Sequence, residues 1–307
     1  MLFKYITVIK MNTNNRFNLK LLLLVCLSFP LHAAEKEVNI DIQNVNDGIY
    51  MLKGQGGNIG ISVGKDGIFM IDDQFAPLSQ KIKSAIKTIS SSPIKFVINT
   101  HWHGDHVGGN QNFAKDDAIV VAQKNVRKRM SSKQFIKLFD KKVPPSAESA
   151  LPIITFSDEI EFHFNGETAQ VIHMPYAHTD GDAIIWFKKS NVVHMGDLYF
   201  ARTFPFIDTS SGGSIDGVIT AVNWVLKNAN KSTRIIPGHG PLSTMEDLLA
   251  YRNMLVDARA RVKEAIIGRG DLERIKTENV LKDLVEKWGN GFIKQEAFVE
   301  IIFDSLN

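Results

Sequence analysis

Short apolar runs separated by glycine, asparagine and aspartate recur along most of this 307-residue chain. A short apolar run bounded by turn residues is typical of a buried strand. The first half of the chain therefore predicts strands at residues 38–42, 49–52, 59–63, 67–71, 95–99 and 118–122. The same pattern in the second half predicts strands at residues 152–156, 160–164, 169–173, 183–187, 191–195 and 234–237.

Helical spacing interrupts these strands. Residues 77–89 and 215–226 place apolar side chains on one face of a helix, and the chain from Met245 onward is predicted to be mostly helical. The Lys- and Arg-rich run 124–142 predicts a solvated helix and loop rather than a binding patch. Gly54–Asn58 predicts a hairpin turn, either a mobile flap or a plain surface turn.

Two strand-rich halves, about 38–120 and 150–240, organise the chain. Each half alternates strands with helical segments, which is the pattern of a layered α/β domain. The sequence therefore predicts two sheets packed face to face with helices on the outside.

The densest polar cluster is His101-Trp102-His103-Gly104-Asp105-His106, directly after the expected strand 95–99. Gly104 is expected to let the chain fold tightly there. Imidazoles and a carboxylate that face one point suit a borderline cation such as Zn²⁺. The alternative, an exposed polar loop, does not explain such a density of histidine.

Three more polar residues, His178, Asp197 and His239, each follow an apolar strand and lie near a glycine. Such positions can converge at one edge of two packed sheets, so these residues are candidates for the same site. His163 and His194 lie inside strands and are interpreted as structural. His173 is either structural or a support for the site.

Residues 1–34 are predicted to be a secretory signal peptide. Arg16 and Lys20 precede a short apolar stretch at 21–29, and Leu31-His32-Ala33 offers a small-residue cleavage site before Ala34. Periplasmic localisation follows, with residues 35–307 as one mature domain. An uncleaved anchor helix is the alternative, and either Met1 or Met11 is the start.

Removing this leader changes the balance of basic and acidic residues. The net charge of +3 comes from 36 basic and 33 acidic residues; without Lys4, Lys10, Arg16 and Lys20, 32 basic residues face 33 acidic ones. A nucleic-acid binder usually shows a basic excess, which this chain lacks. The one cysteine, Cys26, lies in the leader, so a metal site in the mature chain must use His, Asp or Glu.

The order His-x-His-x-Asp-His, then His178, Asp197 and His239, resembles that of the metallo-β-lactamase-fold hydrolases. The resemblance implies a four-layered αβ/βα sandwich with a helical C-terminal extension and two zinc ions at one edge. His101, His103 and His178 resemble the ligands of the first zinc, and Asp105, His106 and His239 those of the second. Asp197 resembles a carboxylate that bridges the metals, and Asp72 an aspartate that supports the histidine loop.

The chain departs from the cysteine-containing β-lactamases of this family. Asp197 stands near the position of their cysteine, and Phe200 stands where they carry a lysine that holds the antibiotic's carboxylate. Arg202 lies close enough in sequence to take the place of that lysine. Members like glyoxalase II carry a C-terminal helical domain, but no glutathione-binding residues are recognised here.

The implied activity is hydrolysis of a small ester, thioester, lactone or lactam by a metal-bound hydroxide. Asp105 is the expected catalytic residue and orients the hydroxide, and Tyr199 or Tyr176 is a candidate donor to the oxyanion. The alternatives are a β-lactamase, an iron-dependent sulfur-metabolising member and a catalytically silent member. No nucleic acid and no stable membrane insertion after processing are expected; substrate and oligomeric state stay open.

Overall fold

The apolar runs of the first half form a seven-stranded sheet in the computed structural model, which describes residues 37–307. Strands β1 to β4 pair in antiparallel fashion, whereas β4, β5, β6 and β9 are parallel neighbours. The sheet order is β1 (Asp41–Asn46), β2 (Ile49–Lys53), β3 (Ile59–Gly64), β4 (Gly67–Ile71), β5 (Ile94–Asn99), β6 (Ile119–Gln123) and β9 (Ile154–Phe156). The predicted leader lies outside the described residues.

The second half forms a five-stranded sheet. Its order is β10 (Glu159–Phe164), β11 (Glu167–His173), β12 (Ala183–Phe187), β13 (Val192–His194) and β14 (Arg234–Ile236). Adjacent strands from β10 to β13 are antiparallel, and β14 runs parallel to β13. Parallel pairing brings the ends of β13 and β14 to the same edge, which places the segments that follow them side by side.

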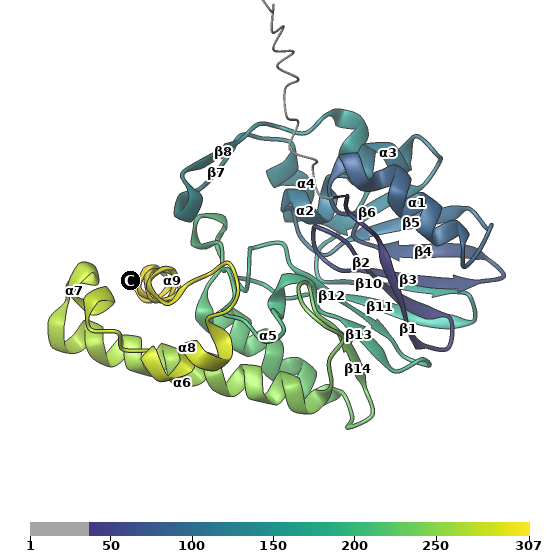
Figure 1. Cartoon of the computed structure of the whole chain (residues 1–307). Coiled ribbons are helices and arrows are strands. Elements are labelled where there is room, and N and C mark those ends of the chain that lie inside the picture. Colours follow the sequence, from purple (N-terminus) through teal and green to yellow (C-terminus); the bar gives the residue numbers. More distant parts are fainter. Residues whose placement is uncertain (1–36) are drawn as a thin grey trace, which may run out of the picture. The chain divides into compact units, whose positions relative to one another are not determined.

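The two sheets pack face to face around an apolar core. Phe69 of β4 contacts Phe162 of β10 and Phe187 of β12, with ring centroids 5.1 and 6.0 Å apart. Helices α1 (Ser79–Lys87) and α3 (Asn110–Ala114) pack on the outer face of the first sheet. Helices α5 (Ile215–Asn228) and α6 (Met245–Arg269) cover the second (Figure 1). The predicted four-layered α/β sandwich is confirmed.

The helical extension predicted from about residue 245 is also confirmed. Helix α6 begins at a capping box made by Thr244 and Asp247 and is followed by α7 (Leu272–Thr277), α8 (Lys282–Trp288) and α9 (Gln295–Leu306). Their apolar faces join the core that covers the second sheet. In the described part of the chain, no helix is both long and apolar enough to cross a bilayer.

The prediction of a solvated helix and loop at 124–142 was wrong in its second half. Helix α4 (Lys124–Met130) is followed by a small hairpin of β7 (Gln134–Ile136) and β8 (Lys141–Val143). The 3₁₀-helix η2 (Lys137–Phe139) forms its tip, and Figure 1 shows the hairpin standing apart from both sheets. Lysines are interspersed with apolar residues in this run, and the sequence did not show that Ile136 and Phe139 line a cavity.

Candidate metal centre

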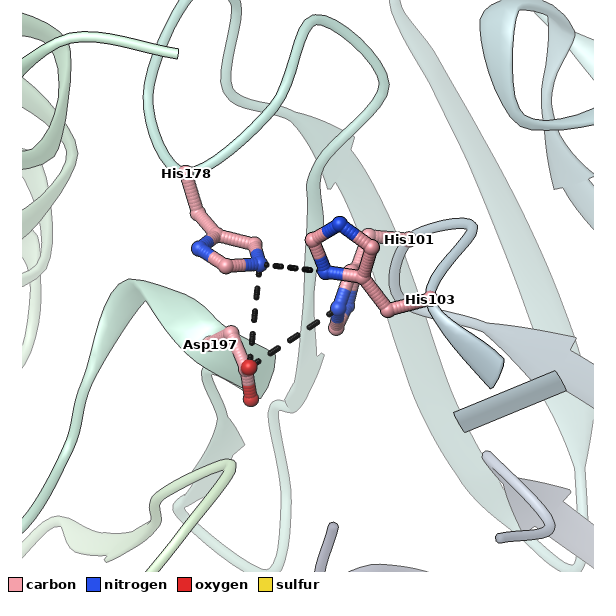
Figure 2. Close-up of side chains that lie close together, drawn as sticks. All are labelled: His101, His103, His178 and Asp197. Carbon is pink, nitrogen blue, oxygen red and sulfur yellow. Dashed lines mark hydrogen bonds and ion pairs between the residues drawn. The ribbon is translucent and has the colours of Figure 1, made fainter. Parts of the chain in front are cut away.

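Seven candidate ligands from five chain segments meet at one edge of the sandwich. They lie in the loop after β5, in the short helix α2 (Gly104–Val107), between β11 and β12, in the 3₁₀-helix η4 (Gly196–Leu198) after β13, and in the loop after β14. One group brings together His101, His103, His178 and Asp197, and a second Asp105, His106 and His239; within each group the ligand atoms lie within 4.8 Å of one another. Figure 2 shows the first group.

Asp197 lies between the two groups. Its Oδ2 is 3.8 Å from Nε2 of His101 and 3.6 Å from Nε2 of His178. Its Oδ1 is 3.1 Å from Nε2 of His106 and 3.4 Å from Nε2 of His239. One carboxylate thus presents one oxygen to each group, which is the geometry that a bridging ligand requires.

Glycine permits this approach. A Cβ at Gly238 would lie 2.1 Å from Oδ1 of Asp197, so any side chain there would displace the carboxylate.

Asp72 supports the second group through His106. Its Oδ2 lies 2.8 Å from Nδ1 of His106, which leaves Nε2 of that ring facing Asp197. Asp72 also accepts hydrogen bonds from the backbone N and from Oγ1 of Thr100, at 2.7 and 2.8 Å. Oγ1 of Thr100 in turn lies 3.0 Å from Nδ1 of His101. Asp72 therefore orients ligands of both groups, as outer partners of metal-binding histidines do.

Asp208 is a supporting residue that the sequence did not reveal. Its Oδ2 lies 3.1 Å from Nε2 of His103, so Nδ1 of that ring faces the group, 2.9 Å from Nε2 of His178. The other nitrogen of His178 lies 2.8 Å from the carbonyl oxygen of Phe206. In the sequence Asp208 is typical of a turn cap, and it does cap the 3₁₀-helix η5 (Thr209–Ser211).

The unpartnered atoms of this centre fit a cation. Nε2 of His101, Nε2 of His106 and Oδ1 of Asp197 are buried and have no hydrogen-bond partner among the described residues. Buried polar atoms without partners are costly, and here they point toward one another. A set of imidazole nitrogens and carboxylate oxygens, without a thiolate, suits Zn²⁺ and other borderline divalent ions.

Charge states also suit metal binding in the first group. Burial lowers the pKa of His101 well below its usual range and that of His178 to about 4, so both rings are neutral at pH 7. Burial alone would raise the pKa of Asp197, but the facing imidazoles of His106, His239 and His101 lower it well below its usual range. Neutral imidazoles and an ionised carboxylate are the forms that bind metal.

In the second group the neighbouring carboxylates favour the protonated form of the imidazoles. Burial would lower the pKa of His239, but Asp197 and Asp105 raise it to about 9. The same carboxylates and Asp72 raise the pKa of His106 well above its usual range, against burial. His106 and His239 in turn lower the pKa of Asp105 to about 2, although burial opposes them. A cation that binds this group must displace protons from imidazoles, so its affinity rises with pH.

Three residues predicted near the site lie elsewhere. Tyr199 is buried with its hydroxyl donating to Oγ of Ser243, because its ring packs on Tyr251 at 4.9 Å. Tyr176 is 67% exposed, and Arg202 is exposed; neither lines the cavity next to the metal centre. The structure therefore does not bring the two tyrosines or Arg202 into the cavity, and their roles as oxyanion donors and as a carboxylate-binding residue stay predictions.

The other three histidines of residues 37–307 lie outside the two ligand groups. His194 is buried in β13, where Nε2 lies 3.1 Å from the carbonyl oxygen of Asn58. His163 is on the exposed face of β10, and His173 has Nδ1 2.9 Å from the carbonyl oxygen of Asp182, in the loop that carries His178. His173 thus supports that loop without contacting a ligand side chain directly.

The glycine-rich segment Gly54–Asn58 is neither a plain surface turn nor a free flap. The backbone N–H of Gly57 donates to the carbonyl oxygen of Asp105 at 3.1 Å. The backbone N–H of Asn58 donates to the carbonyl oxygen of Gly238 at 2.7 Å. The segment therefore packs against both the histidine loop and the His239 loop. Gly104, in contrast, has ample space around it and is not needed for a tight turn.

A cavity of about 600 Å³ opens beside the metal centre, a size typical of small-molecule sites. His103, Asp105, Asp197 and His239 line one end of it. Much of the remaining wall is apolar and includes Trp102, Met130, Ile136, Phe139, Phe206 and Phe292. The hairpin and the segment before α9 supply walls that are distant in sequence from the ligands.

A sequence profile described as the metallo-beta-lactamase superfamily matches residues 63–266. The chain belongs to this superfamily. A Beta-lactamase-like protein 2 homolog of Caenorhabditis elegans is 27% identical over 163 residues, which is 52% of this chain and 48% of that protein. A Hydroxyacylglutathione hydrolase of Methylococcus capsulatus is 32% identical over 106 residues, 34% of each chain. The chain thus matches about half or less of the length of these relatives.

Solved structures of the superfamily share the fold. A metallo-beta-lactamase from Pontibacter korlensis superposes with a TM-score of 0.60 at 16% identity, covering 71% of this chain and 100% of that one. The superfamily consists mostly of metal-dependent hydrolases of small molecules, and the clustered His and Asp side chains place a potential metal site in this member.

Proposed function

We propose that this protein is a dinuclear zinc hydrolase that cleaves a small carbonyl substrate: an ester, thioester, lactone or lactam. The observation that carries the proposal is the placement of Asp197, whose two carboxylate oxygens face two separate ligand groups. A carboxylate shared in this way supports two cations rather than one. The proposal therefore favours a two-metal centre over the single-iron alternative.

The first ion would be held by His101, His103 and His178, and the second by Asp105, His106 and His239, with Asp197 between them. Zinc ions in such a centre supply a nucleophile from water at neutral pH and polarise a carbonyl. Asp105 is the one ligand carboxylate that is partly exposed and lines the cavity beside His239. It is the residue that can orient water toward a substrate, and its low pKa keeps it ionised for that role.

Reconstitution with zinc is expected to give two zinc ions per chain, because the ligands form two groups around one bridge. Elemental analysis of the dialysed mature protein measures this number. A panel of chromogenic lactams, lactones, esters and thioesters then identifies the reaction and separates a β-lactamase from the other hydrolases. One bound ion, or preference for iron, would contradict the two-zinc centre; two zinc ions without turnover on any substrate class would favour a silent member.

We also propose that the protein is secreted to the periplasm, on the strength of the charged and apolar pattern of residues 1–34. Expression of the full chain in a Gram-negative host is expected to give a periplasmic product that begins near Ala34. Intact-mass measurement of the purified protein tests this. A product that retains residues 11–33 would mean that the leader is not cleaved.

A further inference from the structure

Three partly exposed aromatic side chains line the cavity. Phe75, Phe139 and Phe292 all line it, and they are 37%, 46% and 60% exposed. Phe139 joins them to the interior, since its ring lies 4.9 Å from Phe206, whose own ring lies 5.6 Å from that of His103. Exposed apolar surface concentrated at one opening marks a binding site better than scattered single side chains do. An apolar surface therefore continues from the metal centre to the outside.

The charged residues that line the cavity differ in whether another residue of the protein neutralises them. Its two carboxylates, Asp105 and Asp197, both belong to the metal centre. Arg129 also lines it, but its guanidinium is held by both carboxylate oxygens of Asp180, at 2.6 and 2.8 Å. Lys141 lines the wall on β8 and forms no ion pair with any residue of 37–307. It is the uncompensated positive charge of this cavity outside the metal centre.

Several contacts fix the hairpin that carries Lys141. Nζ of Lys137, at the tip, lies 2.6 Å from Oδ2 of Asp304 on α9. Nη1 of Arg129 donates to Oε1 of Gln134 at the start of β7, at 3.0 Å. Lys141 pairs across the hairpin with Ile136, which also lines the cavity. The backbone of the hairpin is therefore fixed beside the cavity, while the side chain of Lys141 is exposed and available to a ligand. A ligand need not order the hairpin in order to bind this lysine.

We propose that Lys141 and the exposed phenylalanines of the cavity select an amphiphilic anion, a small molecule with one negatively charged group and a long or bulky apolar part. The charge pairs with Lys141, and the apolar part packs on Phe139 and Phe292. The inference rests on the proposed function, because it assigns the substrate class of that same cavity. It places substrate recognition on the β7–β8 hairpin rather than on Arg202.

The hairpin offers matched controls for this proposal. Lys142 and Phe135 pair with each other across the two strands, and neither lines the cavity. The variants Lys141→Gln and Lys142→Gln thus make the same change on the same strand, one inside the cavity and one outside. Phe139→Ala and Phe135→Ala form a second pair.

Isothermal titration calorimetry with decanesulfonate, kept below its micellar concentration, tests the proposal without any turnover, because its C–S bond resists hydrolysis. The titration is made on protein freed of metal with EDTA and repeated on zinc-loaded protein. A loss of about 1.4 kcal/mol in binding free energy corresponds to about tenfold weaker binding. Lys141→Gln and Phe139→Ala are each expected to weaken binding about tenfold, and Lys142→Gln and Phe135→Ala less than about twofold.

Ligand controls separate charge from apolarity. Ethanesulfonate is expected to bind far more weakly than decanesulfonate because it lacks the apolar part, and decyltrimethylammonium because its charge is reversed. Equal affinities of the Lys141 and Lys142 variants, equal binding of the cationic amphiphile, or no binding of decanesulfonate would overturn the proposal. Each of these results is independent of zinc stoichiometry and hydrolysis, so failure here is distinguishable from failure of the proposed function.

Discussion

Replacing Asp197 with asparagine is expected to remove the zinc ion of the second group and to leave the fold intact. An amide is neutral and a poorer ligand than a carboxylate, and Oδ1 of Asp197 lies within 3.4 Å of both His106 and His239. The change also removes a negative charge that screens two neighbouring cations from each other. Turnover is expected to fall more than the ~10–100-fold that is typical when an outer partner of a metal ligand is lost.

Zinc content, kcat and thermal melting of the metal-free protein measure these effects together. Asp216→Asn is the control, because it makes the same chemical change at an exposed ion pair with Arg259, outside the ligand groups. Asp197→Cys is expected to retain some zinc, since thiolate suits Zn²⁺, although its different geometry need not support turnover. If Asp197→Asn kept two zinc ions and near-normal kcat, Asp197 would be a turn residue rather than a bridge.

The sequence predicted the fold and the position of the metal centre because both depend on local patterns. Apolar runs with regular turn residues mark the strands, and polar residues after those runs mark the edge where they meet. His101, His103 and His106 lie within one short segment, so their spacing is itself a signal. His178, Asp197 and His239 each follow a strand within a few residues, but they were recognisable only in combination with the first cluster, whose order with them resembles that of the metallo-β-lactamase-fold hydrolases.

The supporting residues and the substrate pocket were not predictable in this way. Asp208 is 105 residues from His103 in sequence, and its cap at η5 gives a sufficient local reason for an aspartate. Lys141 lies in a lysine-rich run that is typical of solvated surface, and only the fold of the hairpin shows which lysine lines the cavity. Tyr199 is close to Asp197 in sequence, but its ring turns into the core under α6.

A second large effect is expected at Gly57, where the glycine-rich segment meets the metal centre. A Cβ at this position would lie 2.1 Å from Cε1 and 2.5 Å from Nε2 of His106, which is far inside van der Waals contact. His106 cannot easily yield, because its Nδ1 is held by the buried Asp72 at 2.8 Å. The segment is fixed as well, by the hydrogen bond from Gly57 to Asp105.

Gly57→Ala should therefore displace Nε2 of His106 from the second ligand group and lower the zinc content toward one ion per chain. Overpacking of this kind typically costs ~1–3 kcal/mol of stability, so the free energy of unfolding should also fall.

Gly104→Ala is the matched control, because a Cβ at Gly104, at the start of α2, would have no heavy atom within 4 Å. At that position alanine is expected to keep both ions and to leave stability unchanged or raised by up to ~1 kcal/mol. Chelator competition and urea unfolding measure both quantities. Two tightly bound zinc ions in Gly57→Ala would show that His106 does not need this close contact and that its role as a ligand must be re-examined.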